Sequence, residues 1–268
     1  MKVVLSSNPY RDRGLRAALE ARDILERAGA QTVLCLPFQP RKGDRLELPR
    51  REKLTALEEE LPSADLLICF GGDGTILHAA RDATLHDIPI LGVNMGSMGF
   101  MAELERSELS MLACLPGGNF TIEERMMLDV RVRRGNKELL SDLALNDAVI
   151  SKGSMARVAE LEVLADDMEV ASVMGDGVIV ATPTGSTAYS MSAGGPIVEP
   201  TSKCLIFTPV CAHQLAARAM VLDANRRVTV RVPRTMRKYL FLSVDGGKAV
   251  RLGGGDRVEI TCASRFTR

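Results

Sequence analysis

The chain has 268 residues, and its 34 basic and 34 acidic residues give a formal net charge of zero. This length predicts one large or two moderate domains that bury a substantial core without disulfides. The balanced charge lacks the electrostatic footprint of a protein that binds nucleic acid or an anionic membrane, so neither partner is expected. The apolar start is too short for a secretory signal and no apolar stretch could span a bilayer, which predicts a cytoplasmic protein.

Six cysteines and three histidines are spread along the chain. The cysteines form no C-x-x-C pair, and the histidines do not cluster with them. Scattered cysteines in apolar runs are typical of reduced core residues. The same spacing makes a zinc site unexpected.

Strand-like and helix-like segments alternate in the first part of the chain. Apolar runs predict strands at 2–6, 31–36, 64–70 and 88–93. An amphipathic pattern predicts a helix over 14–28, and helical composition predicts another over 76–83. A charged, proline-containing stretch at 41–52 is expected to be an exposed loop. Such alternation is typical of a parallel sheet, whose ligands lie beyond the carboxyl ends of its strands.

The pattern changes at the turn sequence Pro116-Gly117-Gly118-Asn119. Strands are predicted after it at 127–133, 144–151, 159–164, 177–181, 204–210, 227–232 and 240–244. Helical signals are sparse there, apart from residues 187–194. The sequence therefore predicts an α/β domain with a parallel sheet over residues 1–118 and a mainly β domain over residues 119–268.

A glycine-rich turn, Phe70-Gly71-Gly72-Asp73-Gly74-Thr75, joins a predicted strand to a predicted helix. This geometry aims backbone N–H groups at an anion, and the three glycines let phosphate oxygens approach the backbone. Because Asp73 would repel phosphate, its carboxylate suits a general base or a magnesium contact. The alternative is that Asp73, or Thr75, only caps the helix.

Residues 181–196 read Ala-Thr-Pro-Thr-Gly-Ser-Thr-Ala-Tyr-Ser-Met-Ser-Ala-Gly-Gly-Pro. This stretch is rich in small hydroxyl side chains, has no charged residue, and follows a predicted buried strand. Its glycines permit a ligand to approach the backbone closely. We interpret it as the wall of a ligand site, and the alternative is an ordinary surface loop.

Two common nucleotide-binding motifs are missing from the sequence. No G-x-x-x-x-G-K-[ST] occurs, since Gly247-Lys248 is followed by Ala249, and no G-x-G-x-x-G follows a strand. The sequence therefore supports neither a P-loop nor a dehydrogenase-type dinucleotide site.

The glycine turn and the 181–196 block together resemble the NAD kinase family. The resemblance extends to Asn146-Asp147 and to Gly175-Asp176-Gly177, in the same order along the chain. It implies a first domain similar to those of phosphofructokinases and diacylglycerol kinases. It also implies transfer of a phosphoryl group from ATP or polyphosphate to the 2′-hydroxyl of the adenosine ribose of NAD, giving NADP, with Mg²⁺ as the divalent metal.

The resemblance implies roles for individual residues. Asp73 is expected to be the catalytic base, while Gly71, Gly72, Gly74 and Thr75 bind the donor phosphates; no metal ligand is assigned. The residues expected to contact NAD are Phe100, Asn146, Asp147, Met174, Asp176, Thr184, Ser186, Thr187, Ala188, Tyr189 and Ser192.

Several of these residues also have a structural interpretation. Asn146 and Asp147 are expected to hold the adenosine ribose, and the alternative is an Asx turn. Asp176 is expected at the adenine amino group, and the alternative is a turn residue. Phe100 and Tyr189 are either walls of the dinucleotide site or core aromatics. Met174 stands where many relatives carry arginine, which removes a cation near the dinucleotide.

The resemblance further implies a homodimer or homotetramer, with the NAD site completed across an interface. It also implies a final segment that returns to the first domain, and this chain is expected to lack that segment. Two other functions stay open: a lipid or sugar kinase that shares the glycine-turn domain, and a catalytically silent NAD-binding sensor.

Overall fold

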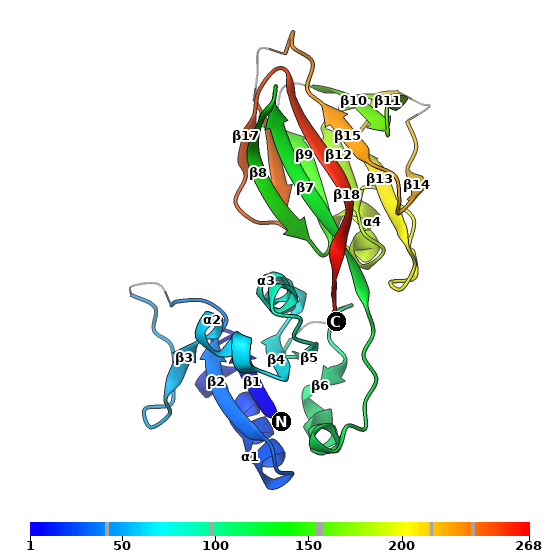
Figure 1. The fold of residues 1–268 in the computed structure, drawn as a ribbon. Coiled ribbons are helices and arrows are strands. Elements are labelled where there is room, and N and C mark those ends of the chain that lie inside the picture. Colours follow the sequence, from blue (N-terminus) through cyan, green and yellow to red (C-terminus); the bar gives the residue numbers. More distant parts are fainter. Residues whose placement is uncertain (41–42, 97–98, 154–157, 215–216, 237–238) are drawn as a thin grey trace. The chain divides into compact units, whose positions relative to one another are not determined.

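The computed structural model describes residues 1–40, 43–96, 99–153, 158–214, 217–236 and 239–268 (Figure 1). They divide into two compact units. The first unit contains Met1–Glu123 together with Thr267–Arg268, and the second contains Glu124–Phe266.

The first unit is built on one sheet of six strands in the order β3-β2-β1-β4-β5-β6 (Figure 1). The strands are β1 (Lys2–Ser7), β2 (Gln31–Leu36), β3 (Leu54–Ala56), β4 (Leu66–Gly71), β5 (Ile90–Asn94) and β6 (Leu104–Glu105). All neighbouring strands pair in parallel. Register aligns the carboxyl ends of the central strands, because Ser7 pairs with Phe70 and Gly71 pairs with Asn94.

Helices cover both faces of this parallel sheet. One face packs against α1 (Arg16–Arg27) and the 3-10 helix η3 (Arg106–Gly117). The other face packs against α2 (Leu57–Glu60), the 3-10 helix η2 (Leu61–Ser63) and α3 (Asp73–Leu85). Successive strand side chains point to opposite faces, so Val3 lies in the first core and Val4 in the second.

The predicted helix over 14–28 begins later than expected. Gly14 has φ 69° and Leu15 has φ 53°, so both are left-handed and end the short 3-10 helix η1 (Arg13–Leu15). The buried carboxylate of Asp12 accepts hydrogen bonds from the N–H groups of Ala17 (3.0 Å) and Ala18 (3.1 Å). It thereby satisfies two free donors in the first turn of α1.

The second unit is a sandwich of two six-stranded sheets. One sheet has the order β11-β10-β15-β18-β7-β8, with β7 (Arg125–Arg134), β8 (Lys137–Ala144), β10 (Ala159–Ala165), β11 (Met168–Gly175), β15 (Val228–Arg231) and β18 (Asp256–Thr267). The other has the order β14-β13-β12-β9-β16-β17, with β9 (Asp147–Lys152), β12 (Gly177–Ala181), β13 (Cys204–Val210), β14 (Met220–Asp223), β16 (Leu240–Val244) and β17 (Val250–Leu252). Apolar side chains of both sheets form the core between them.

The predicted fold class, a parallel α/β domain followed by a mainly β domain, is confirmed.

Three expectations from the sequence are wrong in the structure. The strand predicted over 144–151 is divided, because β8 ends at Ala144 and β9 begins at Asp147. Cys114 and Cys211 are exposed rather than core residues. The chain does return to the first unit: the Ile90 N–H donates to the carbonyl of Arg268 (2.8 Å), and the hydroxyls of Thr84 and Thr267 are 2.9 Å apart.

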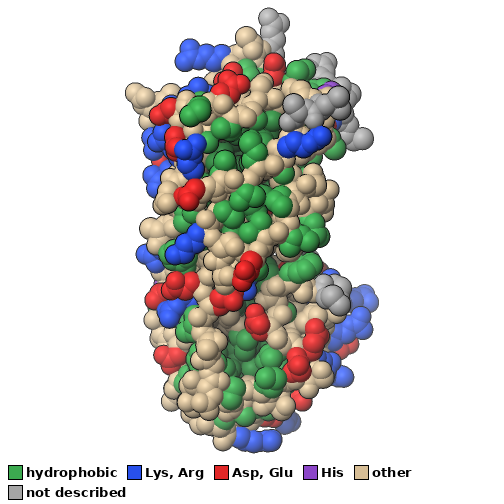
Figure 2. Space-filling model, turned by 90° about the vertical axis from the view of Figure 1, so that its right-hand side faces the viewer, with side chains coloured by type: hydrophobic (Ala, Val, Ile, Leu, Met, Phe, Trp, Pro, Cys, Tyr) green, Lys and Arg blue, Asp and Glu red, His purple; other side chains and the backbone are tan. Residues whose placement is uncertain are grey.

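The surface carries charge of both signs. On the face drawn in Figure 2, basic and acidic side chains are interspersed, in keeping with the zero net charge. Among the described residues, no helix combines the length and apolar character needed to cross a membrane.

Candidate active site

The glycine turn lies where β4 ends at the carboxyl edge of the parallel sheet. Gly72 is the N-cap of α3 and Asp73 is its first residue, so the structure does not support Asp73 as the cap. The Asp73 carboxylate instead accepts hydrogen bonds from the N–H groups of Phe100 (3.0 Å) and Met101 (3.2 Å). A Cβ at Gly99 would overlap this carboxylate. The loop after β5 therefore fixes the direction of Asp73, and each of its oxygens keeps a second lone pair for a ligand.

The three glycines of the turn differ in the space that surrounds their backbone. A Cβ at Gly71 would overlap the Thr75 hydroxyl, so packing requires glycine at this position. Beside Gly72 and Gly74, in contrast, a Cβ would meet no atom within 4 Å. Open space next to the backbone at a helix N-terminus suits an incoming phosphate.

A Gly74→Ala variant separates packing from ligand binding. Alanine at this helical position should stabilise the fold by about 0.5–1 kcal/mol, since glycine loses more backbone freedom on folding. If phosphate approaches Gly74, the added methyl should raise the KM for ATP about tenfold, the equivalent of about 1.4 kcal/mol. Thermal melting and steady-state kinetics measure the two effects. Gly117→Ala is the control in the same unit, because its Cβ would make only an ordinary 3.6 Å contact.

Sequence reasoning missed two polar residues that follow β1 at this same edge. The side-chain amide of Asn8 donates to the Thr75 hydroxyl (3.1 Å), and the Asn8 N–H donates to the Phe70 carbonyl (2.9 Å). Nη1 of Arg11 lies 3.3 Å from the point that a Cβ would occupy at Gly96. Arg11 thus brings a cation to the loop after β5, and inspection of the residues after every predicted parallel strand could have found both.

The second unit brings together the Asn146-Asp147 pair and the start of the 181–196 block. The Thr182 N–H donates to the Asn146 carbonyl (2.9 Å), and the Thr182 hydroxyl donates to the Leu145 carbonyl. The Gly185 N–H donates to the Thr182 hydroxyl (3.0 Å). A Cβ at Gly185 would overlap the Asn146 carbonyl. The two motifs singled out in the sequence therefore pack directly against each other.

Two side-chain oxygens in this region are buried without a partner. They are Oδ1 of Asn146 and Oγ1 of Thr184, and each comes from one of the two motifs. Buried polar atoms in folded proteins are nearly always hydrogen-bonded, so each unpaired atom calls for an explanation. A bound ligand with hydroxyl or N–H donors would supply the missing partners.

Asp147 is buried, Asp245 is half-buried, and their carboxyl groups interact electrostatically. Burial, together with the charge of Asp245, raises the pKa of Asp147 to about 7. Burial also raises the pKa of Asp245, although hydrogen bonds from the N–H groups of Asp147, Leu145 and Asn146 oppose that rise. Asp245 accepts three backbone N–H groups, whereas the described part of the chain places no hydrogen-bond donor on the Asp147 carboxylate.

The Asp147 pKa predicts a pH-dependent stability. Between the ordinary pKa of 3.8 and the raised pKa of about 7, the folded state holds a proton that the unfolded state has lost. Stability therefore falls as pH rises through this window, by about 1.4 kcal/mol per pH unit for one proton. Asp147→Asn cannot ionise, so its Tm should fall less than that of the wild type between about pH 5 and 8.

Melting curves in a pH series test this expectation. Asp166→Asn is the control, since Asp166 is a turn residue at the surface of the same unit. Parallel pH profiles for the wild type and Asp147→Asn would show that Asp147 is ionised throughout.

The remaining predicted NAD contacts fall into two groups. Ser186 is fully buried, and its hydroxyl bridges the N–H and carbonyl of Val198 (3.1 and 3.2 Å), so in this geometry it supports the backbone. Asp176 forms an ion pair with Lys152. The others reach the surface wholly or in part: Phe100, Met174, Thr187, Ala188, Tyr189 and Ser192. Phe100 (68% exposed) and Tyr189 (46% exposed) are thus not core aromatics.

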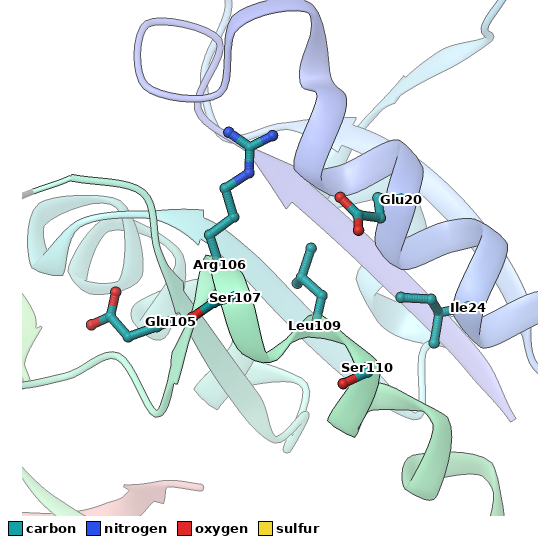
Figure 3. Close-up of a pocket in the computed structure, with 7 residues that line it drawn as sticks. All are labelled: Glu20, Ile24, Glu105, Arg106, Ser107, Leu109 and Ser110. Carbon is teal, nitrogen blue, oxygen red and sulfur yellow. The ribbon is translucent and has the colours of Figure 1, made fainter.

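A separate groove of about 670 Å³ lies between α1 and η3 (Figure 3). Its lining residues are Glu20, Ile24, Glu105, Arg106, Ser107, Leu109 and Ser110. None belongs to the predicted site, although Glu105 accepts hydrogen bonds from the Asn94 side chain at the end of β5 (3.0 and 3.3 Å).

No cluster of three His, Cys, Asp or Glu side chains suited to a metal occurs in the residues that the structure describes.

Comparisons with known proteins bear on both units. The family model of the ATP-NAD kinase N-terminal domain matches residues 13–113, and that of the C-terminal domain matches residues 145–268. The NAD kinase of Ruminiclostridium cellulolyticum is 37% identical over 264 residues, which cover 98% of this chain and 90% of the relative. The NAD kinase of Geobacter metallireducens is 44% identical over 213 residues, which cover 78% and 75%.

Two solved structures are similar to the whole chain. Yeast NADH kinase complexed with NADH has a TM-score of 0.83 at 23% identity, covering 100% of this chain and 83% of that one. An NAD kinase from Archaeoglobus fulgidus in complex with ATP has a TM-score of 0.73 at 23% identity, covering 100% and 92%. At that identity these two similarities establish the fold alone.

The carboxylate-bearing glycine turn and the sequence matches define a kinase, a phosphotransferase with a hydroxyl group as acceptor. Its two units correspond to the two domains of a single kind of kinase. The chain belongs to the ATP-NAD kinase family.

Proposed function

We propose that the protein transfers the terminal phosphoryl group of ATP, or of polyphosphate, to the 2′-hydroxyl of the adenosine ribose of NAD and so makes NADP. The observation that carries this proposal is the Asp73 carboxylate, which two backbone N–H groups hold beside an open glycine turn. Family membership supplies the acceptor class, since the curated relatives are NAD kinases.

Asp73 is the base in the proposed reaction. A sugar hydroxyl is a weak nucleophile at neutral pH, and a positioned base makes it reactive. Asp73 accepts the 2′-hydroxyl proton while the hydroxyl oxygen bonds to the terminal phosphorus. The bond from that phosphorus to its bridging oxygen breaks, and ADP leaves when ATP is the donor. Positioning and charge stabilisation provide most of the acceleration in such reactions.

The residues of the glycine turn fit a magnesium ion. Mg²⁺ in phosphoryl-transfer sites is held by one or two carboxylates together with substrate phosphates and water. Asp73, with a free lone pair on each oxygen and open space beside Gly72 and Gly74, matches that pattern. When bound, the ion would neutralise charge on the transferred phosphoryl group. Gly71 leaves room for the Thr75 side chain, since a Cβ there would overlap the Thr75 hydroxyl.

The second unit supplies the dinucleotide contacts in this proposal. Asn146 and Asp147 hold the adenosine ribose, and the unpaired oxygens of Asn146 and Thr184 accept hydrogen bonds from it. Asp176 binds the adenine amino group. The remaining contacts come from Phe100 of the first unit and from Met174, Thr187, Ala188, Tyr189 and Ser192, while Ser186 supports the backbone beside them through Val198.

A coupled assay tests the function directly. The wild type is incubated with ATP, Mg²⁺ and NAD, and an NADP-specific dehydrogenase measures the product; polyphosphate replaces ATP in a second arm. We expect NADP from NAD and no phosphorylation of diacylglycerol or fructose 6-phosphate. Phosphorylated lipid or sugar without NADP would point to the related kinases, and NAD binding without product would point to a sensor.

Assembly into a homodimer or homotetramer, in the cytoplasm, is part of the same proposal. Both sheets of the second unit end in edge strands, β11 and β8 in one and β14 and β17 in the other, and such edges can pair with another chain. Light scattering of the active enzyme measures the assembly, and an active monomer would contradict it.

A further inference from the structure

A carboxylate about one hundred residues away in the sequence holds the Asn146-Asp147 segment. Asp245 directly follows β16 and has a left-handed φ of 49°, in a turn with Gly246 at φ 68°. Its Oδ1 accepts the N–H groups of Asn146 (2.8 Å) and Asp147 (2.9 Å), and its Oδ2 accepts the N–H of Leu145 (2.7 Å). The Asp245 N–H donates in return to the Asp147 carbonyl (3.0 Å).

This arrangement fixes the backbone of Asn146 from two directions. Three consecutive N–H groups converge on one carboxylate, and such charge-assisted bonds are stronger than bonds between neutral groups. On the other side, the Asn146 carbonyl accepts the Thr182 N–H (2.9 Å). Because the peptide groups on both sides are bound, the direction of the Asn146 side chain is restricted, and its Oδ1 is left buried and unpaired.

The charges around the pair are acidic. Asp147 is 5% exposed and interacts electrostatically with Asp245, and Asp142 is a further acidic group near Asp245. Burial and the charge of Asp142 both disfavour an ionised Asp245, and the three backbone N–H groups oppose that effect. An aspartate at this point is therefore better explained by the backbone that it holds than by charge pairing.

We propose that Asp245 is a positioning residue for the dinucleotide: its carboxylate sets the direction in which Asn146 and Asp147 present their side chains to the ribose. The inference rests on the proposed function, because it concerns the same site. Asp245 itself touches neither reacting group and acts through the segment that it binds. Its loss should therefore weaken the binding of NAD more than the binding of ATP.

Two substitutions remove different parts of the interaction. Asp245→Asn keeps an Oδ1 acceptor for Asn146 and Asp147 but places an NH₂ group opposite the Leu145 N–H, and asparagine tolerates a left-handed φ. Asp245→Gly also tolerates that φ and removes both acceptor oxygens, and with them all three hydrogen bonds. We expect the KM for NAD to rise about tenfold in Asp245→Asn and about a hundredfold in Asp245→Gly, with the KM for ATP changed less than about twofold.

Asp166→Asn is the matched control. Asp166 has a left-handed φ of 56° in the same unit, and its Oδ1 accepts the Arg227 N–H (3.0 Å), away from both motifs. Hydrogen exchange of the Leu145, Asn146 and Asp147 amides adds a direct readout, since these amides should exchange faster in Asp245→Gly and not in the control. Should Asp245→Gly fail to fold, the KM values and exchange rates of Asp245→Asn decide the question.

The outcomes separate this inference from the proposed function. If the wild type makes NADP and the variants raise the KM for NAD selectively, Asp245 is a positioning residue. If the wild type makes NADP but Asp245→Asn and Asp245→Gly keep the wild-type KM for NAD, the inference is wrong. Equal increases in KM for NAD and ATP, together with a lower Tm, would reduce Asp245 to a structural role. A wild type that makes no NADP contradicts the proposed function instead.

Discussion

Replacing Asp73 by asparagine is expected to lower the rate of NADP formation by about two orders of magnitude or more, the usual contribution of a general base. Asparagine has nearly the shape of aspartate and can still accept one of the two N–H groups, from Phe100 or Met101, that hold this side chain. What it cannot do is take the proton of the attacking hydroxyl. The kcat should therefore fall, while the affinity for NAD, measured by calorimetry, stays near the wild-type value.

A control from the same helix separates chemistry from folding. Asp82 lies further along α3, and Asp82→Asn changes the same atoms without touching the glycine turn. Its turnover should match that of the wild type. Near-normal turnover in Asp73→Asn would remove Asp73 from the mechanism, whereas loss of NAD binding together with turnover would assign it to substrate binding.

The second large effect is expected from Gly185→Ala. A Cβ at this position would overlap the carbonyl of Asn146 and lie 2.5 Å from its carbonyl carbon. Backbone atoms cannot rotate away as side chains do, and Thr182 also holds this carbonyl. We expect a loss of about 2 kcal/mol or more in the free energy of unfolding, in the range of an overpacked core. The displaced Asn146 should also raise the KM for NAD at least about tenfold.

Gly253→Ala is the control for this substitution. Gly253 lies in the same unit, and a Cβ there would make only ordinary contacts, at 3.8 Å to Arg134 and 3.9 Å to Asp256. In Gly253→Ala, the free energy of unfolding measured in urea and the KM for NAD should stay close to the wild-type values. A Gly185→Ala protein with unchanged stability and KM would mean that the contact between the two motifs is not needed.

The sequence predicted the elements that have a strong local signal. The strands β2, β12, β13 and β16 have the predicted bounds, since each is a mainly apolar run of strand length. β8 was not predicted, because Lys137–Ala144 carries charged residues on its open face at the edge of a sheet. The late start of α1 depends on left-handed angles at Gly14 and Leu15, and a leucine in that conformation has no sequence signature.

For the candidate site, the sequence predicted the motifs but not the distant residues that hydrogen-bond to them. Asp73 and Thr184 stand in recognisable stretches, and the role of each could be predicted from the resemblance. Asp245 and Asn8 act across the fold, through bonds to Asn146 and Thr75 that only the tertiary structure creates. Short-range patterns carry no information about such partners. Packing requires glycine at position 71 but not at position 74, and this difference also depends on the tertiary structure.

The returning segment at Thr267–Arg268 has a consequence for biosynthesis. The Ile90 N–H and the Thr84 hydroxyl belong to the first unit, yet their partners are synthesised only after the whole second unit. While the ribosome translates residues 124–266, the Ile90 N–H at the start of β5 lacks the partner that it has in the folded protein. The first unit therefore completes these two hydrogen bonds only once residues 267–268 have been synthesised, after the whole second unit.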